Sequence, residues 1–365
     1  MNRVIGIDCF KLQKGMGKSI GIYVFVENFI KNLTRYSDDF DFIIFGNAEN
    51  RKDFEIEGIE FVQVPLDHKK KIICLLWELI FVRHYINVRH VDKMIFPRGF
   101  APLGKGTKNI IVVHDMIPFY YHKQFPRALN IVENAYIMKR LRASIRSSSI
   151  VVTISEFSKS EMERIVPESS AKIKVIYHGY DTIEKGEGNN LLIKDEYIIG
   201  ITSSLPHKNA QGLILAYEKY ILQVEKPLKL VIVGIKDLMN YEEQLSEVAK
   251  KNIIYKNYLD DDQFYTLFKN AKCLLFLSLI EGYGRPPLEA MQFNIPVICS
   301  KRSALPEIVG EAGILVDPEN PTEIAQALVD ILSDDTVREK LIRYGQENLK
   351  RFLWEEQIKK YIELL

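Results

Sequence analysis

The segment that is most informative about the fold is 273–291, CLLFLSLIEGYGRPPLEAM. They begin with a short apolar run, 273–277, which is typical of a buried strand. Two glycines then allow a tight turn, and Pro286 and Pro287 mark the start of a helix, where proline is well tolerated. The segment therefore predicts a strand, a loop and a helix in succession, which is the repeating unit of a parallel α/β sheet.

The same alternation extends through the rest of the chain. In the first half we expect strands at 4–9, 42–45, 59–64, 93–96, 110–114, 150–154 and 173–176, with helices at 20–33, 72–86, 128–146 and 156–165. In the second half we expect strands at 197–202, 228–233, 252–256, 273–277, 297–299 and 313–316. The helices expected there are 209–223, 240–249, 262–270, 287–293, 321–332 and 336–349.

A polar, glycine-containing stretch without periodicity, 182–190, interrupts this alternation near the middle. We therefore expect a first domain at 1–183, a linker at 184–195 and a second domain at 196–349. The predicted fold class is α/β, with two doubly wound, Rossmann-like parallel sheets. Ligands bind at the carboxyl ends of such strands, so two facing domains would hold a ligand in a central cleft.

The composition is that of a globular protein, with 47% hydrophobic and 27% charged residues. It argues against disorder and against a disulfide scaffold. Four scattered cysteines without metal-binding spacing favour a reducing cytoplasm. The sequence shows neither a signal peptide nor an apolar run of about 20 residues, the length of a membrane span. The net charge is +1, but residues 1–185 carry 28 basic and 21 acidic residues, so the first half is basic and the second acidic.

Glu281 and Glu289 are the strongest candidates for a chemical role. The glycines between them let backbone approach a ligand closely, and the first turn of the following helix offers amide groups to an anion. Glu281 would lie on the loop, whereas Glu289 would lie in the helix and could accept hydrogen bonds from a pair of sugar hydroxyls. The alternative is that Glu289 only complements the helix dipole.

On these residues the chain resembles the retaining family 4 glycosyltransferases of the GT-B fold, whose hallmark is a Glu-x7-Glu motif in the second domain. The resemblance covers nearly the whole chain. Further matches are GMGKSIGIY at 15–23, HD at 114–115, ISEFSK at 154–159, VIYHGYD at 175–181, PHKN at 206–209 and ALPEIVG at 304–310.

The resemblance implies a role for each matching residue. Glu289 would bind the ribose of a nucleotide-sugar, and Glu281 would contact hydroxyls of the donor sugar. Lys208 would neutralise the diphosphate leaving group, and His114 would approach the donor sugar and donate or accept a proton near neutral pH. Without the resemblance, Lys208 would more often be a solvated charge and His114 a packed, hydrogen-bonded residue. The loop residues Gly282, Tyr283 and Gly284 complete the donor-binding set.

One position departs from the family pattern. Ser203 stands five residues before Lys208, where the family usually has an arginine, so one positive charge on the diphosphate is missing. We take Ser203 as a donor-binding position and Arg285 as a candidate to replace that charge. The alternative is that Arg285 is an exposed loop charge.

Two other motifs are weaker. The glycine loop at 15–21 does not match the P-loop or the dinucleotide pattern. The resemblance places this loop beside the acceptor and the donor diphosphate, with Gly17 and Lys18 as contacts, although glycine there could simply form a turn. Asp260-Asp261-Asp262 has the spacing of a metal motif, but it precedes a helix and is more simply an N-cap. We predict no metal and no cofactor. Asp115 suits a helix or turn cap.

The first domain also contains a candidate membrane-contacting segment. Lys69-Lys70-Lys71 precedes the apolar stretch 72–82, which contains the aromatic residues Trp77 and Phe81. Such a helix can lie on an anionic membrane, but it can also be an ordinary core element, which we favour. The segment 352–365 is amphipathic, and we expect a helix over 350–365 that packs back on the first domain. A free oligomerisation helix is the alternative.

These observations predict a retaining, metal-independent glycosyltransferase that uses a nucleotide diphosphate sugar and a glycan or lipid-linked acceptor. The resemblance implies a same-face displacement in which the leaving phosphate helps to deprotonate the acceptor. Bacterial surface-polysaccharide assembly, with mannosyl or rhamnosyl transfer, is the expected setting, and nucleic acid is not an expected partner. The alternatives are a non-catalytic protein of the same fold and a Rossmann oxidoreductase, which lacks its fingerprint here.

Overall fold

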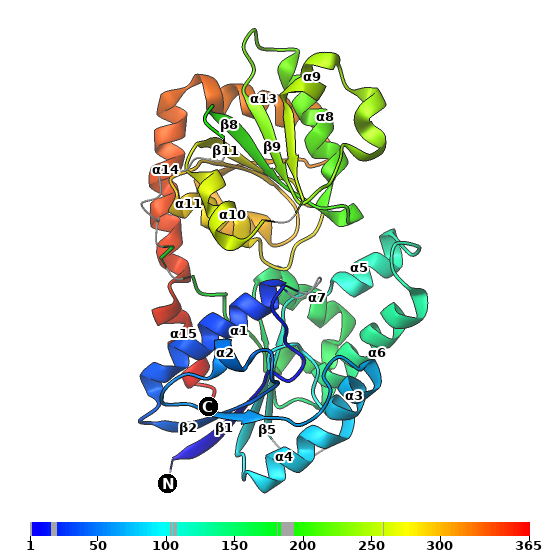
Figure 1. Cartoon of the computed structure of the whole chain (residues 1–365), viewed down its shortest axis with the longest axis vertical. Helices are drawn as coiled ribbons and strands as arrows, with labels where there is room; N and C mark the ends of the chain where they lie inside the picture. The colour runs from blue at the N-terminus through cyan, green and yellow to red at the C-terminus, as the bar shows by residue number, and fades with distance from the viewer. Residues whose placement is uncertain are drawn as a thin grey trace. The chain divides into compact units, whose positions relative to one another are not determined.

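The computed structural model describes residues 2–15, 20–102, 104, 108–180, 182–183, 193–257 and 259–365. The chain divides into two compact units (Figure 1). Unit 1 comprises residues 1–181 and 352–365, and unit 2 comprises residues 182–351.

Unit 1 is built on a seven-stranded sheet in the order β3-β2-β1-β4-β5-β6-β7. All neighbouring strands pair in parallel. The strands are β1 (Arg3–Asp8), β2 (Phe40–Gly46), β3 (Glu60–Gln63), β4 (Lys93–Phe96), β5 (Lys108–Val113), β6 (Ile150–Thr153) and β7 (Ile173–Val175). The helices are α1 (Ile20–Leu33), α2 (Arg51–Phe54), α3 (Lys71–Leu76), α4 (Val82–Val88), α5 (Ile117–Gln124), α6 (Ile131–Ser147), α7 (Glu156–Ile165) and α15 (Trp354–Ile362).

Helix α15 returns to unit 1 after the whole of unit 2 and packs against α1 (Figure 1). Aromatic side chains form this contact: the rings of Phe29 and Tyr361 lie 4.8 Å apart, and those of Phe25 and Trp354 lie 5.8 Å apart. Gly179 is required below Trp354, because a Cβ there would lie 2.2 Å from the indole ring. The α15 segment is therefore an integral part of the first core.

Unit 2 has a six-stranded sheet in the order β10-β9-β8-β11-β12-β13, again with parallel pairs throughout. The strands are β8 (Tyr197–Ile201), β9 (Lys229–Val233), β10 (Ile253–Lys256), β11 (Ala271–Phe276), β12 (Val297–Ser300) and β13 (Gly313–Val316). The helices are α8 (Ala210–Ile221), α9 (Glu247–Asn252), α10 (Asp261–Phe268), α11 (Arg285–Gln292), α12 (Leu305–Val309), α13 (Pro321–Ser333) and α14 (Asp335–Leu349).

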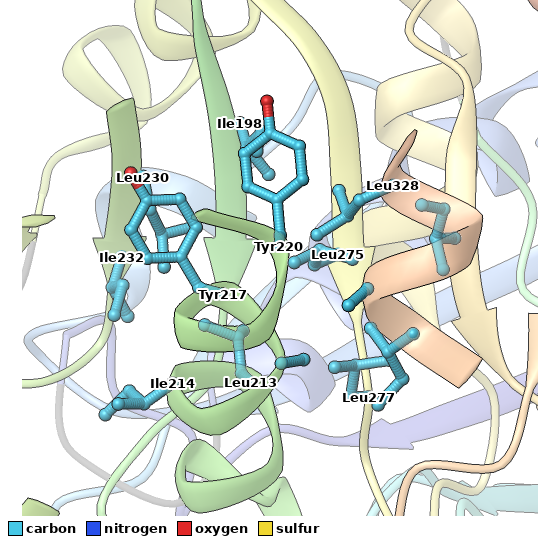
Figure 2. Close-up of a cluster of buried hydrophobic side chains, with 14 of the residues drawn as sticks. Ile198, Leu213, Ile214, Tyr217, Tyr220, Leu230, Ile232, Leu275, Leu277 and Leu328 are labelled. Carbon is cyan, nitrogen blue, oxygen red and sulfur yellow. The ribbon is translucent and has the colours of Figure 1, made fainter. Parts of the chain in front are cut away.

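The core of unit 2 forms where α8 and α13 cover one face of the sheet (Figure 2). Leu213 and Tyr217 of α8, together with Leu328 of α13, pack on strand residues such as Ile198 and Leu275. All five side chains are fully buried. This packing fixes α8, and with it the residues that precede its first turn.

The predicted fold class is confirmed, since both sheets are parallel and lie between helices. Two predicted helices are interrupted. The helix expected at 72–86 consists of α3, a π-helical turn over Trp77–Phe81 and α4, whereas the one expected at 240–249 is a 3-10 turn, Met239–Gln244, followed by α9. The short helices α2, α5 and α12 were not predicted.

Candidate functional site

In unit 2, the candidate donor residues gather at the carboxyl ends of β8 and β11. Lys208 ends a 3-10 turn, Pro206–Lys208, and is followed by Asn209 in the left-handed conformation at φ 54°. Asn209 caps α8 by accepting from the Gly212 N–H at 3.1 Å. Its amide donates to the Leu277 carbonyl at 3.1 Å and to the Pro318 carbonyl at 2.7 Å. Asn209 thus ties the loop that carries Lys208 to the end of β11.

Lys208 and Glu281, which are 73 residues apart in sequence, form an ion pair with 2.6 Å between Nζ and Oε1. Glu281 is 8% exposed, and its main-chain N–H donates to the Ser303 hydroxyl at 2.9 Å. The Lys208 ammonium also lies 5.8 Å from the centre of the Phe276 ring. The structure therefore brings together the two residues expected to hold the diphosphate and the donor sugar.

Glu289, the second glutamate of the motif, also forms an ion pair. Its Oε1 lies 2.7 Å from Nε of Arg285, four residues earlier in α11, and 3.5 Å from the Tyr265 hydroxyl of α10. Glu289 is 7% exposed. Arg285 is the first residue of α11 rather than a loop residue; its side chain is 39% exposed, and its described carboxylate partner is Glu289.

The loop between the two glutamates is buried from Glu281 to Gly284. Gly284 has φ +105°, and a Cβ there would lie 2.4 Å from Leu305, so this position requires glycine. Helix α11 begins at Arg285, two residues before the predicted start at 287, which puts Pro286 and Pro287 in its first turn. Because proline has no N–H, the amide donors at this helix start are those of the residues around the two prolines, and the anion site stays a prediction.

Ser203 lies on the loop after β8. Its hydroxyl accepts from the Leu205 N–H at 3.3 Å. Beside this loop, Gly234 follows β9 at φ +108°, and a Cβ there would lie 2.0 Å from the Thr202 carbonyl oxygen. The Thr202 hydroxyl donates to the Lys208 carbonyl at 2.8 Å. Gly234 therefore allows the backbone approach that places Ser203 and Lys208.

In unit 1, His114 follows β5 and is buried, with both ring nitrogens engaged. Nε2 lies 2.7 Å from the Pro97 carbonyl oxygen, and Nδ1 lies 3.1 Å from Nε2 of His178. Because a carbonyl only accepts, Nε2 carries the proton and the neutral ring accepts from His178 at Nδ1. Burial lowers the pKa of His114 to about 4, whereas the Pro97 carbonyl works in the opposite direction. The expectation that His114 exchanges protons near neutral pH is corrected, because the ring stays neutral there.

A cavity of about 930 Å³ opens beside His114 in unit 1. Its wall includes Phe100 and Tyr136 and the ion pair Lys11–Glu78, with 2.6 Å between Nζ and Oε1. Apolar and aromatic side chains with a few polar groups are typical of cavities that bind small molecules.

Several residues around these sites were missed from the sequence. Asp8 ends β1 and accepts from the Trp77 indole N–H at 2.9 Å, and burial raises its pKa to about 6 although that hydrogen bond lowers it. Glu78 pairs with Lys11, and His178 contacts the predicted residue His114. Asp8 could have been found, because it follows an apolar strand just as His114 does.

Gly17 and Lys18 lie outside the described residues. Asp115 accepts from the Ile117 N–H at 2.9 Å, and Asp260 accepts from the Gln263 N–H at 2.8 Å, so both predicted caps are confirmed. Among the described residues, no group of three or more His, Cys, Asp or Glu side chains could hold a metal ion. In the same part of the chain, no helix is long and apolar enough to cross a membrane.

Two family models match the chain, one for each half. Residues 21–184 match the model described as Glycosyltransferase Family 4, and residues 183–348 match the model described as Glycosyl transferases group 1. Together they extend over most of the chain.

The relatives found by sequence include two mannosyltransferases. The O-antigen chain mannosyltransferase B of Escherichia coli is 29% identical over 245 residues, which are 60% of this chain and 61% of that protein. The O-antigen chain mannosyltransferase RfbU of Salmonella typhimurium strain LT2 is 27% identical over 251 residues, 67% of each chain. The match thus spans less than two thirds of the first of these relatives.

Solved structures show the same fold over the full length. Sucrose-phosphate synthase from Thermosynechococcus elongatus has a TM-score of 0.74 at 16% identity, covering 100% of this chain and 98% of that chain. Anabaena Alr3699/HepE in complex with UDP and glucose has a TM-score of 0.68 at 17% identity, covering 100% and 99%. At these identities, the likeness concerns the fold.

Proposed function

The chain belongs to the GT-B glycosyltransferases of family 4, and we propose that it transfers a hexose with retention from a nucleotide diphosphate sugar to a glycan hydroxyl. The observation that carries this proposal is the pair Lys208–Glu281, which joins a phosphate-binding cation to a buried carboxylate at the ends of parallel strands. The complex of HepE with UDP and glucose supports a nucleotide-sugar donor.

In the proposed donor site, Lys208 neutralises the diphosphate and Glu281 accepts from hydroxyls of the sugar. Glu289 accepts from the ribose, while the loop Gly282–Gly284 brings backbone close to the donor. The pairing of Arg285 with Glu289 supports a role in orienting that carboxylate. The hypothesis that Arg285 also compensates for Ser203 at the diphosphate stays a prediction.

In the proposed reaction, the acceptor oxygen forms a bond to the anomeric carbon on the face from which the diphosphate leaves. The bond between that carbon and the phosphate oxygen breaks, and the departing phosphate takes the proton of the acceptor hydroxyl. The protein's main contribution is charge stabilisation on the leaving group, which Lys208 supplies. Neutral His114 acts as neither an acid nor a base, and because both of its ring nitrogens have partners within unit 1, its contact with the donor sugar stays a prediction. No metal or cofactor takes part, so activity should persist in EDTA.

The proposed sugar is mannose, because both relatives described above are O-antigen mannosyltransferases; rhamnose is the next candidate. The proposed acceptor is a growing surface polysaccharide, bound in the 930 Å³ cavity of unit 1. Its lining includes Lys69 and Lys71, as well as Val132, which is 79% exposed. Basic and apolar groups around one opening suit a lipid-linked acceptor at an anionic, cytoplasmic membrane face.

A thermal-shift screen against UDP-, GDP- and dTDP-sugars tests the donor class. A donor at 100 times its Kd should stabilise the protein by about 2.7 kcal/mol. Nuclear magnetic resonance of the product then gives the anomeric configuration. A product with inverted anomeric configuration would contradict the proposed retention. If no donor were bound or hydrolysed, a non-catalytic protein would be favoured.

A further inference from the structure

Arg302 and Asp317 form an ion pair that joins the loops after β12 and β13 in unit 2. Nη2 of Arg302 lies 2.9 Å from Oδ1 of Asp317, and the two side chains are 36% and 32% exposed. The same nitrogen lies 2.7 Å from Oε2 of Glu319, so Arg302 bridges two carboxylates of the loop after β13. An ion pair so accessible to water contributes little to stability, which makes the segments that it connects more informative than its strength.

The residue after Arg302 supports Glu281. The main-chain N–H of Glu281 donates to the Ser303 hydroxyl at 2.9 Å, and the main-chain carbonyl of Glu281 accepts from the Ala304 N–H at 3.4 Å. Ser303 has φ +58°, a left-handed conformation that a residue other than glycine keeps only where its surroundings hold it. Its hydroxyl donates to the Arg302 carbonyl at 2.7 Å. The position of Glu281 therefore depends on the loop that Arg302 anchors.

The residue after Asp317 supports Lys208 in a similar way. The Pro318 carbonyl accepts from the side-chain amide of Asn209 at 2.7 Å, and Asn209 directly follows Lys208. The approach is close, because a Cβ at Gly212 in the first turn of α8 would lie 2.6 Å from the Pro318 carbonyl oxygen. The loop after β13 therefore lies against the start of α8 and fixes the backbone beside Lys208.

These contacts form a closed ring across the carboxyl ends of the neighbouring strands β8, β11, β12 and β13. Lys208 and Glu281 close this contact ring on one side, and Arg302 and Asp317 close it on the other. A donor diphosphate that drew the Lys208 ammonium away from Glu281 would open the first of these links. The ion pair between Arg302 and Asp317 would still join the two loops that support Lys208 and Glu281.

We propose that Arg302 and Asp317 are positioning residues of the donor site, and that their ion pair keeps Lys208 and Glu281 at a fixed separation before and after a donor binds. This role rests on the proposed function of the site. A preorganised charge stabilises a leaving group only where it is correctly placed, and a misplacement of about 1 Å can lower a rate about 100-fold. A partly exposed ion pair can therefore affect catalysis much more than it affects folding.

The first test measures the kinetics of sugar transfer in Arg302→Met and in Asp317→Asn/Glu319→Gln, which removes both carboxylates that Arg302 contacts. Each variant should lower kcat about tenfold. Their combination should lower kcat no further, because the residues act through one contact. The control is Lys229→Met, which removes another partly exposed ion pair, with Asp195, at the start of β9 and should keep the wild-type kcat. The urea midpoints of the test variants should shift no more than that of the control. Multiplied losses in the combined variant, or a wild-type kcat in Arg302→Met, would overturn the proposal.

The second test does not depend on turnover. The coupling between Lys208→Met and Glu281→Gln, obtained from the unfolding free energies of the single and double variants, reports how firmly this pair is held. It should fall when Arg302→Met is also present and stay unchanged with Lys229→Met. An unchanged coupling in the Arg302→Met background would overturn the proposal. A reduced coupling in a protein that neither transfers nor hydrolyses any donor would support the positioning role and contradict the proposed glycosyl transfer.

Discussion

The Lys208 ammonium lies 2.6 Å from the carboxylate of the buried Glu281, so in the proposed donor site a diphosphate would compete with this glutamate for the cation. Lys208→Met leaves Glu281 buried without this partner. Removing one member of a buried pair costs about 3–5 kcal/mol, and removing a preorganised charge lowers kcat about 100- to 1,000-fold. We therefore expect Lys208→Met to lower both the free energy of unfolding and sugar transfer.

The double variant Lys208→Met/Glu281→Gln separates the two effects. It removes both charges, so urea unfolding should show most of the lost stability restored, while transfer stays as low as in Lys208→Met. A double variant that regains transfer would show that Lys208 matters only for folding.

A second prediction concerns Arg285 and Glu289. If Arg285 orients the ribose-binding carboxylate, Arg285→Ala should raise the KM for the donor about tenfold and leave kcat nearly unchanged, because the interaction is equal in the ground and transition states. Arg338→Ala, which removes the cation that pairs with Asp335 within α14, is the control and should change neither constant. A fall in kcat with constant KM would instead indicate that Arg285 stabilises the leaving diphosphate.

The buried His114 predicts a pH-dependent contribution to stability. Its pKa is about 4 in the folded protein and about 6.5 when unfolded, so the unfolded chain binds the proton first as the pH falls. This group therefore lowers the free energy of unfolding from about pH 6.5 down to pH 4, by about 3 kcal/mol in total. The free energies of unfolding of wild type and His114→Gln, measured in urea, should therefore differ by about 3 kcal/mol less at pH 4 than at pH 7. If the free energies of unfolding of the two proteins changed in parallel with pH, His114 would be readily protonated in the folded protein.

Gly234→Ala should destabilise the protein and weaken donor binding together. The new Cβ would meet the Thr202 carbonyl, and alanine at positive φ adds strain of about 1–3 kcal/mol. Gly21→Ala is the control, since a Cβ at this position in α1 meets nothing within 4 Å and should stabilise the helix by up to about 1 kcal/mol. A Gly234→Ala protein that binds donor as wild type does would mean that the Ser203 loop lies outside the donor site.

The strand pattern was predictable because the strands of a parallel sheet are short apolar runs, and the thirteen strands within the described residues lie where such runs occur. The π-helical turn at Trp77 was not predictable, because it depends on a tertiary hydrogen bond from the indole to Asp8 and on packing against Phe10. Helix α12 was missed because its five residues are too few to show a period.

The residue types and their spacing in the sequence identified the candidate residues, but they did not identify the residues that each candidate contacts. The pairing of Lys208 with Glu281 depends on the way Asn209 ties two distant loops together. The neutral state of His114 depends on burial and on Pro97 and His178, neither of which is adjacent to it in sequence. The motif residues were therefore visible in the sequence, whereas their ionisation and pairing required the fold.

The return of α15 to unit 1 has a consequence for synthesis on the ribosome. The aromatic face of α1 that receives Trp354 and Tyr361 cannot close until residues 182–351 have been translated. At about 5–20 residues per second, this interval is roughly 10–30 s. The first unit to emerge is thus the last to be completed, and Phe25 and Phe29 remain an aggregation-prone surface on the nascent chain while unit 2 is being made.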